Sequence, residues 1–131
     1  MVRFRHLRRL AFGLLLVLGT NSAAFAHAFL DHADPAVGST VTAPPKEIRL
    51  WFTEKLEPAF STLHVADGAG KTVDSGDGAV DSSDSMQLRV SLPALPPGTY
   101  RVIWRVLSVD SHTTEGDFTF EVKAGEVRSG P

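Results

Sequence analysis

The sequence predicts an all-β domain, a small antiparallel sandwich or barrel. Residues 47–54, 86–92 and 100–107 each alternate apolar and polar side chains, the period of two that marks a half-buried strand. Proline and glycine separate these segments, and after the first 26 residues no stretch has the apolar spacing of a helix. Short strands about ten residues apart, without helices between them, are typical of antiparallel β folds.

The first strand is expected in residues 47–54, where Ile48, Leu50 and Phe52 lie on one side of an extended chain. A shorter alternation at 63–65 predicts the next strand. In both segments the apolar side should face the core and the polar side should face solvent.

The stretch from 67 to 84 is rich in Gly, Ser and Asp, so we expect a long loop with one short strand at 71–73. Its aspartates raise the question of calcium, but their spacing matches no EF-hand loop and lacks the closing glutamate. A solvated acidic loop is the simpler interpretation. The aspartates concerned are Asp74, Asp77, Asp81 and Asp84.

Residues 86–92 show the clearest alternation in the chain, and Met86 falls on the apolar side, which predicts a core position for it. Pro93 to Gly98 supplies a turn, so we expect the following strand, 100–107, to pair with 86–92 as a hairpin. Apolar residues alternating at 118–122 predict a last strand.

The first 26 residues have the composition of a secretory signal peptide. A basic start precedes an apolar run from Leu10 to Leu18, and Ala24-Phe25-Ala26 matches the small-x-small pattern that signal peptidase cleaves. The apolar run is shorter than the about 20 residues that a bilayer span needs. We therefore expect export to the periplasm, a mature domain at 27–123 that is not embedded in the membrane, and a flexible tail at 124–131.

Cleavage would make the domain acidic. The chain has 13 Lys and Arg against 15 Asp and Glu, and the leader removes four Arg and no acid, which leaves 9 bases and a net charge near −6. Such a surface disfavours nucleic acid as a partner and suits cations. The chain contains no cysteine, so disulfides and thiolate metal sites are excluded.

Cleavage would also make His27 the first residue, with a free α-amine. The amine and the imidazole Nδ1 can then close a chelate ring on one metal ion. A free α-amine has a pKa of about 7.7–8.0, so a strong Lewis acid can displace its proton at neutral pH. Nitrogen donors in a tetragonal plane favour Cu(II). A histidine that merely falls at the cleavage point is the alternative.

The Asp110-Ser111-His112 motif adds two donors. In an extended segment residues i and i+2 point to the same side, so the carboxylate and the imidazole would be presented together. With the amine and ring of His27 they make an N₃O set, which suits Cu(II) better than the mostly tetrahedral Zn(II). A polar turn after a strand is the alternative.

Several motifs together resemble the CopC family of periplasmic copper-resistance proteins over essentially the whole mature region. The resemblance implies a Greek-key β barrel related to immunoglobulin-like sandwiches, with one Cu(II) held by the amine and imidazole of His27, Asp110 and His112. Glu54 matches a family position near the copper, where a carboxylate is a weak axial donor or orients a ligand; an exposed strand-end glutamate is the alternative. The motifs are His27 to Leu30, Asp34 to Gly38, Leu50 to Glu54, Gly98 to Val106, Ser108 to His112 and Gly116 to Phe120.

The chain departs from the family pattern in two places. Ser111 and Thr113 stand where members often have Gly and Pro, which alters the loop without removing a donor. Some members carry a second, Cu(I)-selective site of clustered methionines, whereas only Met86 remains here after cleavage. The sequence therefore predicts Cu(II) binding and no methionine-rich Cu(I) site.

Two other histidines have weaker grounds as ligands. His32 lies near the expected N-terminus, but the family pattern needs no histidine there, so a contact with the metal stays open. His64 falls on the polar side of its strand without a neighbouring donor, which favours a surface histidine.

The leading hypothesis is a periplasmic Cu(II)-binding protein and not an enzyme, because four donors leave little room for a substrate. It would sequester copper for homeostasis or resistance and pass it to a separate CopD-like inner-membrane transporter or another carrier. The alternative is a histidine-brace copper oxidase of the lytic polysaccharide monooxygenase kind; Asp110 and the 105 residues left after cleavage argue against it. A metal-free immunoglobulin-like structural module is the third possibility.

Overall fold

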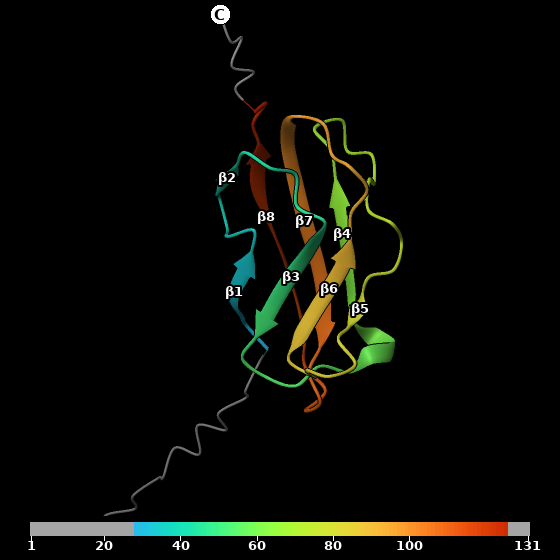
Figure 1. Cartoon of the computed structure of the whole chain (residues 1–131). Coiled ribbons are helices and arrows are strands. Elements are labelled where there is room, and N and C mark those ends of the chain that lie inside the picture. The colour runs from blue at the N-terminus through green and yellow to red at the C-terminus, as the bar shows by residue number, and fades with distance from the viewer. Residues whose placement is uncertain (1–27, 126–131) are drawn as a thin grey trace, which may run out of the picture.

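Two four-stranded sheets pack against each other around one apolar core (Figure 1). The structure is a computed structural model that describes residues 28–125. The expected signal peptide (1–26), His27 and residues 126–131 of the expected tail lie outside that range. The strands are β1 (Leu30–Asp34), β2 (Thr40–Val41), β3 (Glu47–Phe52), β4 (Thr62–Ala66), β5 (Ala79–Val80), β6 (Gln87–Ser91), β7 (Gly98–Leu107) and β8 (Thr113–Val122).

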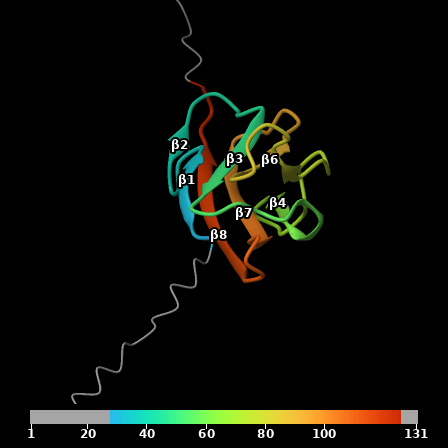
Figure 2. The ribbon, with the colours of Figure 1, turned by 90° about the horizontal axis from the view of Figure 1, so that it is seen from below.

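The first sheet has the strand order β1-β3-β6-β5 and the second has the order β2-β8-β7-β4. Neighbouring strands run antiparallel, except that β2 lies parallel to β8. Figure 2 shows β1 and β8 close together at one edge of the sandwich. The predicted all-β sandwich is confirmed.

The only helical element in residues 28–125 is a short 3₁₀ turn, η1 (Pro58–Phe60). No helix of this part of the chain is long and apolar enough to cross a membrane.

The core is made by the apolar side of each alternating strand. Ile48, Leu50 and Phe52 are buried on β3, and Tyr100 and Val102 are buried on β7. Burial of one face sets which residues point inward, because a shift of one residue would turn every apolar side chain to solvent. The predicted face of β3 is confirmed.

The expected hairpin between residues 86–92 and 100–107 is wrong. β6 pairs with β3 and β5 in one sheet, whereas β7 pairs with β4 and β8 in the other. The connection at 93–97 therefore crosses between the sheets. It contains three prolines, which have no N–H to donate to a ladder, so it does not extend either strand.

The core position predicted for Met86 is also wrong, because Met86 is exposed and Gln87 is buried in its place. The chain turns just before β6. Asp84 Oδ1 accepts a hydrogen bond from Met86 N (3.0 Å), and Asp84 O accepts one from Gln87 N (3.0 Å). β6 thus begins at Gln87, and Met86 lies in the turn before it.

The loop from 67 to 84 differs from its prediction in two ways. Its short strand is β5 at 79–80, whereas Thr72 makes only an isolated bridge to Ala66. Its acidic residues are also not all solvated, because the side chain of Asp74 is only 1% exposed. Asp74 Oδ2 accepts from Val65 N (2.8 Å) and Oδ1 from Gly76 N (2.9 Å), so this carboxylate anchors the loop to β4.

Candidate metal centre

Asp110 and His112 lie in the tight turn that joins β7 to β8 at one end of the sandwich (Figure 1). The extended geometry expected for this motif is wrong. Ser111 N donates to Ser108 O (2.9 Å), and Ser111 has a left-handed φ of 72°. Glycine, which the resemblance to the CopC family implies at this position, adopts this conformation without the strain that a side chain causes.

The turn brings the two predicted donors together. His112 Nδ1 lies 3.3 Å from Asp110 Oδ1, and the two side chains are 33% and 38% exposed. Nδ1 is thus the ring nitrogen of His112 that faces the Asp110 carboxylate.

The buried side chain of Ser108 contacts both Asp110 and His112 and stabilises this turn. Its Oγ donates a hydrogen bond to Asp110 Oδ1. The same hydroxyl lies 3.2 Å from His112 O and 3.4 Å from His112 N. The Ser108 hydroxyl holds the pKa of the Asp110 carboxyl below its ordinary value, aided by His112 and opposed by partial burial. Asp110 is therefore ionised at neutral pH, the form that binds cations.

The segment directly after His27 is anchored beside this turn. Ala28 is buried, and its carbonyl accepts a hydrogen bond from Thr114 Oγ1 (2.6 Å), two residues after His112. Phe29 N donates to Thr53 Oγ1 (3.0 Å), and Thr53 N donates to Phe29 O (2.9 Å). No signal in the sequence singles out Thr114 or Thr53, because their partners are far away along the chain.

Glu54 lies on a segment that contacts both the N-terminal segment and the turn. It is half-buried and follows Thr53 directly. The next residue, Lys55, accepts a hydrogen bond at its carbonyl from Val109 N (3.0 Å). Among residues 28–125, however, no three His, Cys, Asp or Glu side chains form a group that could hold a metal ion. Asp110 and His112 thus meet as a pair of side chains without a third such group, and His27 lies outside the described residues.

The remaining histidines lie elsewhere. His32 on β1 stacks on Trp51, with ring centroids 4.3 Å apart and planes at 8°, and its Nδ1 lies 2.6 Å from Asp31 Oδ2. His64 has an exposed side chain 3.5 Å from Asp74, in agreement with the predicted surface position. These contacts occupy His32 and His64 with partners other than Asp110 and His112.

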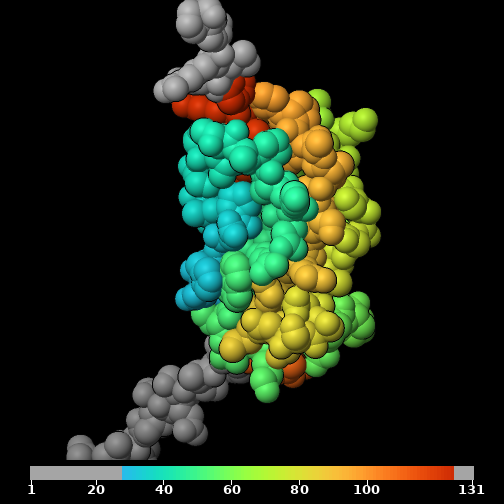
Figure 3. Space-filling model, viewed as in Figure 1, coloured from blue at the N-terminus to red at the C-terminus, as the bar shows by residue number. Residues whose placement is uncertain are grey.

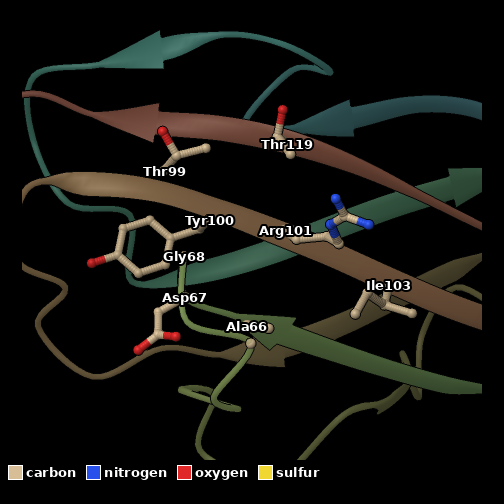
Figure 4. Close-up of a pocket in the computed structure, with 9 residues that line it drawn as sticks. Ala66, Asp67, Gly68, Thr99, Tyr100, Arg101, Ile103 and Thr119 are labelled. Carbon is tan, nitrogen blue, oxygen red and sulfur yellow. The ribbon is translucent and has the colours of Figure 1, made fainter.

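Figure 4 shows a surface cavity of about 360 Å³, and no residue of this turn lines it. Its lining includes Asp67, Tyr100, Arg101 and Thr119, and Tyr100 lies near the start of β7, at the opposite end from Asp110. Burial raises the pKa of the Tyr100 hydroxyl, which donates to Pro96 O (2.5 Å). This cavity takes no part in the candidate centre.

The fold defines the chain as a two-sheet β-sandwich domain. Residues 30–123 match the family model described as "CopC domain". Protein YobA of Escherichia coli (strain K12) is 38% identical over 116 residues, which cover 88% of this chain and 94% of that protein. Copper resistance protein C of Pseudomonas syringae pv. tomato is 35% identical over 125 residues, which cover 89% and 98%.

The solved structure of CopC from Methylosinus trichosporium OB3b superposes with a TM-score of 0.68 at 36% identity, covering 76% of this chain and 97% of that one. The chain belongs to the CopC family. The family resemblance that the sequence motifs predicted is confirmed.

Proposed function

We propose that this chain is exported to the periplasm, where it binds one Cu(II) ion, sequesters it and passes it to a separate CopD-like membrane transporter or another carrier. Membership of the CopC family supports this proposal, and the Pseudomonas syringae relative is a copper resistance protein C. On this proposal the chain is a binding protein and not an enzyme, because four donors fill the equatorial plane of the metal.

The observation that carries the proposal is the hydrogen bond between Thr114 Oγ1 and Ala28 O (2.6 Å). It anchors the residue that follows His27 beside the strand on which the His112 turn ends. Consecutive Cα atoms are about 3.8 Å apart, so a chain beginning at His27 would carry its amine and imidazole next to this turn. We assign both as ligands with Asp110 and His112, and Glu54 as a weak axial donor or an orienting group.

The donor chemistry favours Cu(II) over Cu(I). Amine, imidazole and carboxylate suit Cu(II), whereas Cu(I) prefers thiolate and thioether sulfur. After cleavage the chain would contain no cysteine and one methionine, Met86. We therefore assign a single Cu(II) site and no methionine-rich Cu(I) site.

Loss of the Asp110 and His112 side chains tests this site. In the processed protein that begins at His27, D110A/H112A is expected to weaken Cu(II) binding by more than the roughly 10- to 100-fold that loss of a supporting group costs. The reason is that two of four donors are removed. Competition with a chromophoric chelator measures the affinity, and electron paramagnetic resonance reports the loss of a nitrogen donor.

D31A/H32A is the matched control, because it removes an Asp–His pair held at 2.6 Å on β1. Its affinity should stay within about threefold of the native value, since that pair lies outside the proposed site. Equal losses in the two double variants, or no loss in either, would contradict the assignment.

Thr114→Val is expected to weaken Cu(II) binding about tenfold, because it removes the hydroxyl that anchors Ala28 while keeping a β-branched side chain. Thr114→Ser should restore the affinity. A purely structural role would lower the free energy of unfolding by about 1–3 kcal/mol without changing affinity well below Tm. Chelator competition and thermal unfolding of the same samples separate the two cases.

A further inference from the structure

Four exposed apolar side chains lie on segments at the same end of the sandwich as the candidate metal centre. Their exposed fractions are 59% for Phe29, 66% for Phe60, 38% for Met86 and 52% for Val109. We propose that they form a docking surface for a protein partner that presents an apolar patch within a basic rim and takes the metal from this centre. The proposal rests on the proposed function and adds the surface chemistry of the partner.

The four side chains belong to one end of the molecule because their segments all bond to residues 52–57. That segment continues from β3 and leads into η1, at the end where the β7–β8 turn lies (Figure 1). Figure 3 shows the green and yellow segments of the chain side by side at this lower end. The bonds run from Phe52 N to Met86 O (2.9 Å), from Thr53 N to Phe29 O (2.9 Å), from Val109 N to Lys55 O (3.0 Å) and from Phe60 N to Glu57 O (3.2 Å).

These bonds fix the backbone that displays each side chain. A partner that covers them therefore orders little additional chain, which removes one of the main costs of association. Exposed aromatic residues held in place are also typical anchors of protein interfaces. Elsewhere in residues 28–125, the only large apolar side chains with a similar exposed fraction are Val37 and Ile103.

A shallow cavity of about 320 Å³ gives this surface a place for a partner side chain. Phe60 forms one wall, and Leu107 and Thr113 line the cavity from the ends of β7 and β8. Thr113 is the neighbour of His112 in the chain. A side chain seated here would therefore bring the donors of the partner close to the metal.

The charges at this end favour a basic partner. Residues 52–60, 84–87 and 107–113 contain four acids and one base. Arg105, which lines the cavity, lies opposite Glu115 in the β7–β8 register. A second copy of the chain would place two acidic rims face to face, and an anionic membrane would be repelled in the same way. The four acids are Glu54, Glu57, Asp84 and Asp110, and the base is Lys55.

The transfer that this surface serves is an exchange of ligands. Cu(II) keeps its charge and oxidation state, and each bond broken to a donor of this chain is replaced by a bond to a donor of the partner. Covering the centre excludes water that would otherwise compete for each position as a donor of this chain is released.

The test uses metal-free, processed protein and a short amphipathic peptide with leucine on one face and arginine on the other. We expect amide NMR shifts in residues 52–60, 85–87 and 107–113. F60S/M86S should weaken peptide binding about tenfold, since it removes two apolar anchors. V37S/I103S is the matched control and should leave it unchanged, and both double variants should bind Cu(II) with native affinity.

The outcomes separate this proposal from the metal site, because the peptide is bound without metal. Shifts elsewhere, no binding, or equal binding of a peptide with serine in place of leucine would overturn the docking surface and leave the Cu(II) titrations unaffected. A dimer in sedimentation that F60S/M86S abolishes would assign the surface to a second copy and overturn it too. Binding to phosphatidylcholine–phosphatidylglycerol vesicles that the same variant abolishes would overturn it in favour of a membrane.

Discussion

One alanine added in front of His27 is expected to weaken Cu(II) binding more than a hundredfold, the largest change that we predict from a single added residue. The addition converts the α-amine of His27 into an amide, which is not basic, and opens the chelate ring. Two adjacent donors are affected at once, so the loss should exceed the roughly 10- to 100-fold effect of a supporting group. Chelator competition measures the affinity, and electron paramagnetic resonance shows the altered donor set.

The same sample supplies its own control. If the added residue is removed by a specific protease, so that the chain again begins at His27, the native affinity should return. The same alanine added after Pro131 should have no effect. Unchanged affinity with the alanine still in place would show that the amine is not a ligand.

On the proposed function, cleavage of the leader therefore does more than direct export. The uncut precursor would carry His27 inside the chain, without a free amine, and should bind Cu(II) poorly. A copper ion would then meet a complete donor set only after processing. The anchoring of Ala28 by Thr114 supports this order, because it holds the residue that follows His27 on a side chain two residues after His112.

Much of the strand pattern was predictable because burial of one face leaves a direct trace in the sequence. Ile48, Leu50 and Phe52 alternate with polar residues, and all three are buried. Strand partners leave no such trace. β6 and β7 alternate equally well, so local pattern alone did not show that they lie in opposite sheets. Strands as short as β2 and β5 have too few residues for any period.

One contact of the candidate centre was predictable from the sequence, but its geometry was not. Asp110 and His112 lie together as expected, but through a turn with a left-handed Ser111 instead of an extended segment. The supports are also invisible in sequence, since Thr114 and Ala28 are 86 residues apart. Such contacts depend on the closing of the sandwich, which no local spacing encodes.

Gly116→Ala is expected to lower the free energy of unfolding by about 2 kcal/mol, within the range for overpacking a core. A methyl group at Gly116 would overlap Cζ2 of Trp104 and lie 2.8 Å from its Cη2. The half-buried indole packs on two aromatic side chains, with its centroid 6.2 Å from that of Phe52 and 6.0 Å from that of Phe118, so moving it would disturb these contacts. Urea and thermal unfolding measure the effect, and each kcal/mol should lower Tm by roughly 4–8 °C.

Gly68→Ala is the matched control, because no atom lies within 4 Å of its added methyl group, and it should leave the stability nearly unchanged. Gly116→Ala is also measured in a Trp104→Leu background. In that background Gly116→Ala should cost much less, since the two side chains compete for the same space and their effects are not additive. Equal costs of Gly116→Ala in both backgrounds would mean that the glycine is required for the conformation of β8 and not for the packing of Trp104. The overlap with Trp104 would then have no part in the cost of Gly116→Ala.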